Sequence, residues 1–116
     1  MQRILLKSKI HRVRVTGAEL YYEGSIAVDP ALLEAADILP GEKVEVLNLN
    51  NGSRIETYAI AGKKNSGEVC LNGPAARSGC KGDEVVIVAY ALVDEADAEK
   101  FKNKIVHVDT SNRVKA

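Results

Sequence analysis

The pairs Gly24-Ser25 and Gly52-Ser53 each join a flexible backbone to a hydroxyl nucleophile. Glycine has no Cβ and adopts backbone shapes that other residues avoid. A serine directly after it can fold its hydroxyl back onto the preceding carbonyl, which would break the chain and leave a new reactive end. Asn51-Gly52 is a strong hairpin signal, and it explains Gly52-Ser53 as part of a turn. Gly24-Ser25 is therefore the candidate for chain cleavage.

Other familiar catalytic patterns are weak in this sequence. His11 and His107 are the only histidines, and neither has a cysteine or carboxylate at ligand spacing, so we expect no metal site. Composition leaves a Ser-His-Asp triad open, but there is no G-x-S-x-G elbow and no phosphate loop. Cys70 and Cys80 fit neither a disulfide framework nor a C-x-x-C site, and we interpret them as free thiols.

Composition indicates one soluble domain with a real core, because 46% of the 116 residues are hydrophobic and 28% are charged. A net charge of zero and 4% aromatic residues argue against a nucleic-acid partner. No apolar run is long enough for a membrane span, and the N-terminus becomes polar too soon for a signal peptide. We expect a cytoplasmic protein. Residues 1–24 hold five Lys or Arg and no acid before Glu19, which indicates either a solvated strand face or a site for a small anion.

The chain reads as short strands separated by turn residues. Asp29 as N-cap and Pro30 at the first helical position predict the best helix, over 29–36. Thr16 and Glu19 have capping-box spacing and predict a short helical turn. Residues 94–102 are also expected to be helical, and 72–77 to form a loop or one helical turn. Strands are expected at 10–15, 22–28 (interrupted at Gly24), 43–49, 54–61, 69–71 and 84–92, with a last hairpin at 105–108 and 113–114. The pattern predicts a mainly β fold, a small closed β-barrel.

The residues around Gly24-Ser25 resemble the pyruvoyl-dependent aspartate 1-decarboxylases. The resemblance runs from about Ile10 to Tyr90 and more loosely to the end, and the total length also fits. No single motif is specific, but together they are. The motifs are Lys9-Ile10-His11-Arg12-Val13, Val15-Thr16, Leu20-Tyr21-Tyr22-Glu23-Gly24-Ser25, Asn51-Gly52-x-Arg54, Thr57-Tyr58-Ala59-Ile60, Asn72-Gly73-x-Ala75-Ala76 and Gly82-Asp83.

The resemblance implies a double-psi β-barrel made as an inactive precursor. By analogy, the Ser25 hydroxyl attacks the Gly24 carbonyl, and the single domain 1–116 is cut into a small chain, 1–24, and a large chain, 25–116. Ser25 becomes a covalent pyruvoyl group at the new N-terminus, without metal or pyridoxal phosphate. Loss of CO₂ from an amino acid leaves a carbanion, which needs an electron sink that no unmodified side chain provides. The pyruvoyl carbonyl would form a Schiff base with the substrate amine and accept those electrons.

The resemblance also assigns roles in cleavage and catalysis. Thr57 corresponds to the residue that polarises the Gly24 carbonyl during cleavage and then lines the substrate site. Tyr58 corresponds to the proton donor to the carbanion. His11 and Tyr22 correspond to residues near the cleavage site, where we expect supporting roles.

A second group of residues corresponds to the substrate-binding part of the family's site. Arg54 is a forked, permanently charged donor suited to a carboxylate, and Lys9 would add a second positive charge. Asn72 and Gly73 correspond to the loop that positions the substrate. Pro74 stands where the family commonly has alanine, and proline has no backbone N–H. Ala75 would therefore have to supply the N–H contact.

The function expected from the resemblance is decarboxylation of L-aspartate at C1 to β-alanine and CO₂, in pantothenate biosynthesis. The family forms homotetramers with active sites between subunits. One alternative is a non-catalytic β-barrel module, either a DNA-binding regulator or an oligomerisation domain. Another is a pyruvoyl decarboxylase for a different amino acid. Fold alone would not choose among them, because small barrels host many functions.

Overall fold

The computed structural model describes residues 1–115, which form mainly β structure. These residues contain one α-helix, α1 (Pro30–Ala35), and two 3₁₀ helices, η1 (Gly73–Ser78) and η2 (Glu95–Lys100). None of the helices in this described part is long and apolar enough to cross a membrane. The strands are β1 (Gln2–Arg14), β2 (Gly17–Glu19), β3 (Ser25–Val28), β4 (Lys43–Asn48), β5 (Arg54–Ala61), β6 (Val69–Asn72), β7 (Glu84–Asp94) and β8 (Lys104–His107).

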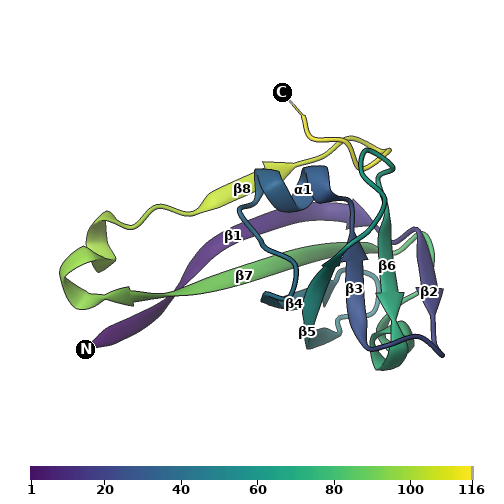
Figure 1. Cartoon of the computed structure of the whole chain (residues 1–116), viewed down its shortest axis with the longest axis horizontal. Helices are drawn as coiled ribbons and strands as arrows, with labels where there is room; N and C mark the ends of the chain where they lie inside the picture. Colours follow the sequence, from purple (N-terminus) through teal and green to yellow (C-terminus); the bar gives the residue numbers. More distant parts are fainter. Residues whose placement is uncertain (116) are drawn as a thin grey trace.

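The strands lie in the order β2-β6-β3-β5-β4-β7-β1-β8 (Figure 1). The chain directly after β1 also bonds to the start of β6, because the Thr16 N–H donates to the Val69 carbonyl at 2.7 Å. The Val69 N–H donates in return to Thr16 Oγ1 at 2.9 Å. These bonds join strands from distant positions in the sheet order. The predicted small β-barrel is thereby confirmed.

The barrel interior is filled by branched aliphatic side chains, as the strand pattern predicts. On β4, Val44, Val46 and Asn48 are buried while the residues between them are more exposed, which is the alternation expected of a half-buried strand. On β5 the more exposed residues alternate with less exposed ones up to Ala59, which is fully buried. The largest fully buried hydrophobic side chains are Ile10, Ile26, Leu32, Leu71 and Ile87.

The longest element, β1, starts at Gln2, eight residues before the predicted strand. Its first half pairs antiparallel with the second half of β7, from Gln2 opposite Asp94 to Leu6 opposite Tyr90. Figure 1 shows these two strands leaving the barrel together as an arm, with η2 at its tip. We call residues 2–6 and 90–94 the β1–β7 arm.

The helical turn predicted at 16–19 is wrong, because Gly17–Glu19 form strand β2. This strand pairs parallel with β6, from Gly17 opposite Cys70 to Glu19 opposite Asn72. The Thr16 hydroxyl donates to the Val69 carbonyl instead of capping a helix. The helix predicted at 29–36 is confirmed, and its N-cap Asp29 accepts from the Ala31 N–H. The last hairpin is reduced to a bridge between Val108 and Val114, while β8 pairs parallel with β1.

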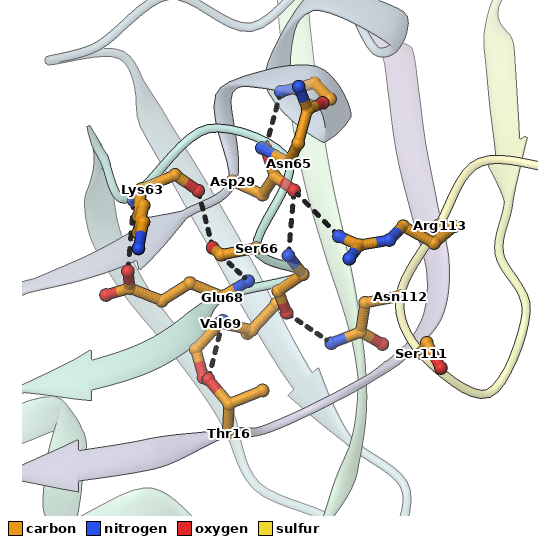
Figure 2. Close-up of polar contacts among 12 residues, drawn as sticks. Thr16, Asp29, Lys63, Asn65, Ser66, Glu68, Val69, Ser111, Asn112 and Arg113 are labelled. Atoms are coloured by element: carbon orange, nitrogen blue, oxygen red, sulfur yellow. Dashed lines mark hydrogen bonds and ion pairs between the residues drawn. The ribbon is translucent and has the colours of Figure 1, made fainter.

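The buried carboxylate of Asp29 fixes the end of β3. Its Oδ1 accepts from the backbone N–H groups of Ala31 and Asn65, and its Oδ2 accepts from that of Gly67, each at 2.9 Å. Figure 2 shows this cluster, in which Asn112 also donates to the Gly67 carbonyl. Burial raises the pKa of Asp29, but these N–H donors and Arg113 more than offset it, so the pKa lies below its ordinary value.

Candidate active site

The Ser25 hydroxyl is held at the first residue of β3. Ser25 is 2% exposed and lies opposite Asn72, the last residue of β6, which is 4% exposed. Asn72 Nδ2 donates to Ser25 Oγ at 3.2 Å, and Ser25 Oγ donates to the Glu23 carbonyl at 3.2 Å. The candidate nucleophile is thus fixed by two hydrogen bonds beside the Gly24-Ser25 peptide bond.

Cys70 determines which way the Asn72 amide faces. Its Sγ donates to Asn72 Oδ1 at 3.4 Å, so the amide nitrogen faces Ser25. Burial, followed by Glu68 and Glu19, raises the pKa of Cys70 and keeps the thiol protonated as a donor. Sequence reasoning treats Cys70 only as a free thiol. The available signal is its spacing, because residues i and i+2 of a strand point to the same face.

Gly73 packs directly on the backbone that precedes Ser25. A Cβ at Gly73 would lie 2.7 Å from Gly24 Cα and 2.8 Å from the Tyr22 carbonyl oxygen. Its φ of +63° is also one that side chains rarely adopt. A Cβ at Gly24 would in turn lie 3.3 Å from Pro74 Cδ. The start of η1 can approach the predicted cleavage point this closely because residue 73 is glycine, and a Cβ at Gly24 would make the contact tighter still.

A pocket of about 410 Å³ opens beside this crossing. Strand β5 supplies Thr57 and Tyr58 to its wall, and Tyr58 is 41% exposed. Strand β5 can do this because it pairs parallel with β3, Ile26 lying opposite Ala59. The residues that line the pocket are Gly24, Ile55, Glu56, Thr57, Tyr58, Pro74, Ala75 and Ser78.

Eight of the predicted site residues therefore gather around the crossing of β3 and η1. They are Gly24, Ser25, Thr57, Tyr58, Asn72, Gly73, Pro74 and Ala75. The main chain of Tyr22 reaches Gly73, while its side chain is exposed. Their roles stay predictions, but the fold places them where one reaction could use them.

The Arg54 side chain binds residues of strands β4 and β7 in its own chain. Its Nη2 contacts Glu45 Oε1 and the Tyr90 hydroxyl, each at 3.1 Å, and Tyr90 donates to the same Glu45 oxygen at 2.7 Å. The hydrogen bonds from Tyr90 and Arg54 lower the pKa of Glu45. Arg54 is outside the set that lines the pocket beside Gly24.

Lys9 and His11 also lie away from this pocket, on β1. Lys9 is half-buried, between Val88 of β7 and Ile105 of β8. His11 lines a different pocket, of about 610 Å³, and packs edge-to-face on His107 with ring centres 5.6 Å apart. Partial burial, followed by His107, lowers the pKa of His11. In residues 1–115, no three His, Cys, Asp or Glu side chains gather as a metal site would require.

Comparison with known proteins gives a full-length match. A model of the family described as "Aspartate decarboxylase" matches residues 1–115. The chain belongs to the aspartate decarboxylase family. This membership confirms the resemblance derived from the motifs around Gly24-Ser25.

Several relatives in the aspartate decarboxylase family are similar along nearly their whole length. A protein of Syntrophus aciditrophicus named "Aspartate 1-decarboxylase" is 56% identical over 115 residues, which cover 99% of both chains. Proteins of the same name are 53% identical in Thermoanaerobacter pseudethanolicus, with 97% of both chains covered, and 58% identical in Flavobacterium psychrophilum, with 91% of both covered. The family is one of carboxy-lyases, and the match extends past both ends of the region that carries the motifs.

Proposed function

We propose that this protein decarboxylates L-aspartate at C1, giving β-alanine and CO₂, with a pyruvoyl group formed from Ser25. The observation that carries the proposal is the buried Ser25 hydroxyl, bonded to Asn72 and set beside a pocket walled by Gly24, Thr57 and Tyr58. Family membership supports the substrate. We further propose that the reaction takes place in the cytoplasm and supplies β-alanine for pantothenate biosynthesis.

The precursor first cuts its own chain. Ser25 Oγ attacks the Gly24 carbonyl carbon and the Ser25 nitrogen leaves as an amine, so an ester replaces the peptide bond. Loss of the Ser25 Cα proton then breaks the Cβ–Oγ bond, which leaves Gly24 with a carboxylate and residue 25 as dehydroalanine. Water adds to this end and ammonia leaves, which gives the pyruvoyl group. Thr57, on the pocket wall with Gly24, is suited to polarise the carbonyl that is attacked.

The residues around the pocket then serve decarboxylation. The pyruvoyl carbonyl supplies the electron sink that amino-acid decarboxylation requires. Asn72 donates to residue 25 in the precursor and keeps a donor beside that position. Tyr58 lies on the pocket wall and donates a proton to the carbon that CO₂ leaves. Ala75 offers the backbone N–H that Pro74 lacks.

We expect a second copy of the chain to complete the site, because the substrate carries more charge than this pocket can neutralise. Aspartate carries two carboxylates, yet none of the residues lining the pocket is cationic. Lys9 and Arg54 would reach it from a neighbouring subunit, in a homotetramer with sites between subunits. The β1–β7 arm supports such an assembly, because Ile4 is 72% exposed and Leu92 is 66% exposed on it.

Position-specific labelling tests the reaction. Mature protein is incubated with L-aspartate carrying ¹³C at C1 or at C4, and released CO₂ is measured by mass spectrometry. We expect labelled CO₂ from the C1 substrate only, with stoichiometric β-alanine. Ser25→Ala is the matched control and should release none. Release from C4, or no release from either substrate, would contradict the proposal.

A further inference from the structure

Three side chains from the β4–β5 hairpin donate to one backbone oxygen, the carbonyl of Ser78 at the end of η1. The distances to this oxygen are 3.1 Å from Asn48 Nδ2, 2.9 Å from Asn51 Nδ2 and 3.1 Å from Ser53 Oγ. A carbonyl oxygen has two lone pairs, so three donors saturate it. Ser78 itself lines the pocket beside Gly24. The hairpin therefore holds one end of the pocket wall.

Asn51 makes two contacts at once. Its Oδ1 accepts from the Ser53 N–H at 2.8 Å, which closes the turn locally. Its Nδ2 donates to Ser78, 27 positions away in the sequence. The turn is closed by the first, local contact together with the bond from the Gly52 N–H to the Asn48 carbonyl at 2.9 Å. The second contact, to Ser78, has no role in forming the hairpin, although Asn51-Gly52 reads in the sequence as turn chemistry alone.

A second layer of contacts fixes the chain just after η1. Asn48 Nδ2 also donates to Asp83 Oδ2 at 2.9 Å, and that oxygen accepts from the Cys80 N–H at 3.0 Å. A Cβ at Gly79 would lie only 2.9 Å from Asn48 Nδ2, so the segment packs closely against this amide. The other end of η1 is fixed by Gly73 on the Gly24 backbone. Helix η1 is thus clamped at both ends.

We propose that Asn51 is a positioning residue for substrate binding, acting through Ser78 to fix the η1 wall of the pocket. The inference rests on the proposed function in one respect, that this pocket takes L-aspartate. The bond between Ser25 and Asn72 joins β3 to β6 and involves neither Asn51 nor Ser78. Loss of the Asn51 donor therefore loosens the substrate wall and leaves chain cleavage intact.

The test is Asn51→Asp, with Asn50→Asp as the matched control. The first variant keeps the Oδ1 contact to the Ser53 N–H but places an oxygen against the Ser78 carbonyl. The second makes the same change one residue earlier and keeps its own contact, Oδ1 accepting from the Glu84 N–H at 2.8 Å. KM and kcat for L-aspartate are measured on the mature proteins, together with backbone deuterium uptake of residues 73–79.

For Asn51→Asp we expect KM to rise roughly fivefold, the equivalent of one net hydrogen bond, with kcat nearly unchanged. Deuterium uptake at 73–79 should be faster in Asn51→Asp than in wild type or in Asn50→Asp. Ser53→Ala, which removes one of the three donors and keeps the turn, should raise KM about twofold. It serves as the second variant if Asn51→Asp folds poorly.

Wild-type KM and uptake in both Asn51→Asp and Ser53→Ala would overturn the inference. Equal changes in Asn51→Asp and Asn50→Asp would also overturn it, because the turn would then act only on general stability. If the wild type releases no CO₂ from L-aspartate, the proposed function is refuted. Faster uptake in Asn51→Asp but not in Asn50→Asp would still uphold the positioning of the wall.

Discussion

The two Gly-Ser pairs show how one dipeptide acquires two meanings. Ser25 is buried, its hydroxyl bonds to Asn72, and Gly24 meets η1 at close range. Gly52 lies in an open turn with φ of +75°, where a Cβ would meet nothing within 4 Å. Segments far along the chain pack closely around Gly24-Ser25. Neighbouring residues form the turn at Gly52, and the Ser53 hydroxyl bonds to Ser78 of η1. The capacity for cleavage therefore belongs to the surroundings of the pair and not to the pair itself.

Replacing each of the two serines tests the difference between the pairs most directly. Ser25→Ala removes both the nucleophile and the source of the pyruvoyl group, so cleavage and CO₂ release should fall to background. Ser53→Ala should leave the chain cut between residues 24 and 25. Both are measured by gel electrophoresis after prolonged incubation and by CO₂ release from L-aspartate. A cut Ser25→Ala chain would show that the nucleophile is misassigned.

The next largest difference is expected between alanine substitutions at Gly73, which is closely packed, and at Gly52, which lies in an open turn. Gly73→Ala forces a Cβ onto the Gly24 backbone at a positive φ, and we expect loss of cleavage and a cost of about 3 kcal/mol in unfolding free energy. Gly52→Ala meets only backbone strain, about 1 kcal/mol, and should cleave normally. The unfolding free energies are measured by urea unfolding. Both glycine variants carry Ser25→Ala for this measurement, so that neither chain is cleaved. Equal costs at the two glycines would contradict the close packing.

The strand that begins with Ser25 should also respond to acid through Asp29. Because the pKa of Asp29 is lowered in the folded state, its contribution to stability is complete above its unfolded pKa and is lost as the pH falls through the folded pKa. Wild type should therefore lose stability below about pH 4. Asp29→Asn should cost about 2 kcal/mol at neutral pH and show a flatter acid limb. Parallel acid limbs in the two proteins would assign the acid sensitivity to other carboxyls.

The smallest effect is expected at Cys70, which orients Asn72 toward Ser25. Cys70→Ala should slow cleavage about threefold, because the Asn72 amide loses the donor that sets its direction. Cys70→Ser keeps a donor and should restore the rate, and Cys80→Ser, at an exposed thiol, should not change it. The time course of cleavage after refolding gives the rates. Equal slowing in Cys70→Ala and Cys70→Ser would indicate a packing role.

Elements with local signals are the ones that the sequence predicts well. Asp29-Pro30 begins a helix, and Asn51-Gly52 forms a turn, because each conformation depends on residues a few positions away. The segment 16–19 shows the opposite case. Its capping-box spacing is overridden by parallel pairing with β6, whose residues are more than 50 positions away in the sequence. The first half of β1 is missed for the same reason, since its partner is at the far end of β7.

In the candidate site, too, some features could be predicted from the sequence and others could not. Residue types and the family resemblance predict Gly24, Ser25, Thr57 and Asn72, and the fold brings them together. The contacts of Cys70 with Asn72 and of Asn51 with Ser78 were not predicted. They depend on side-chain directions that only the folded sheet defines. The sequence also does not show that Arg54 pairs with Glu45 inside its own chain.

Intact-mass spectrometry of freshly purified and aged protein tests the central claim most directly. The account predicts that the full chain is replaced over time by two fragments, 1–24 and 25–116, and that the larger one has a pyruvoyl end in place of a free amino group. Ser25→Ala should stay whole throughout. A wild-type chain that stays whole under all conditions, or one that is cut at Gly52-Ser53, would contradict it.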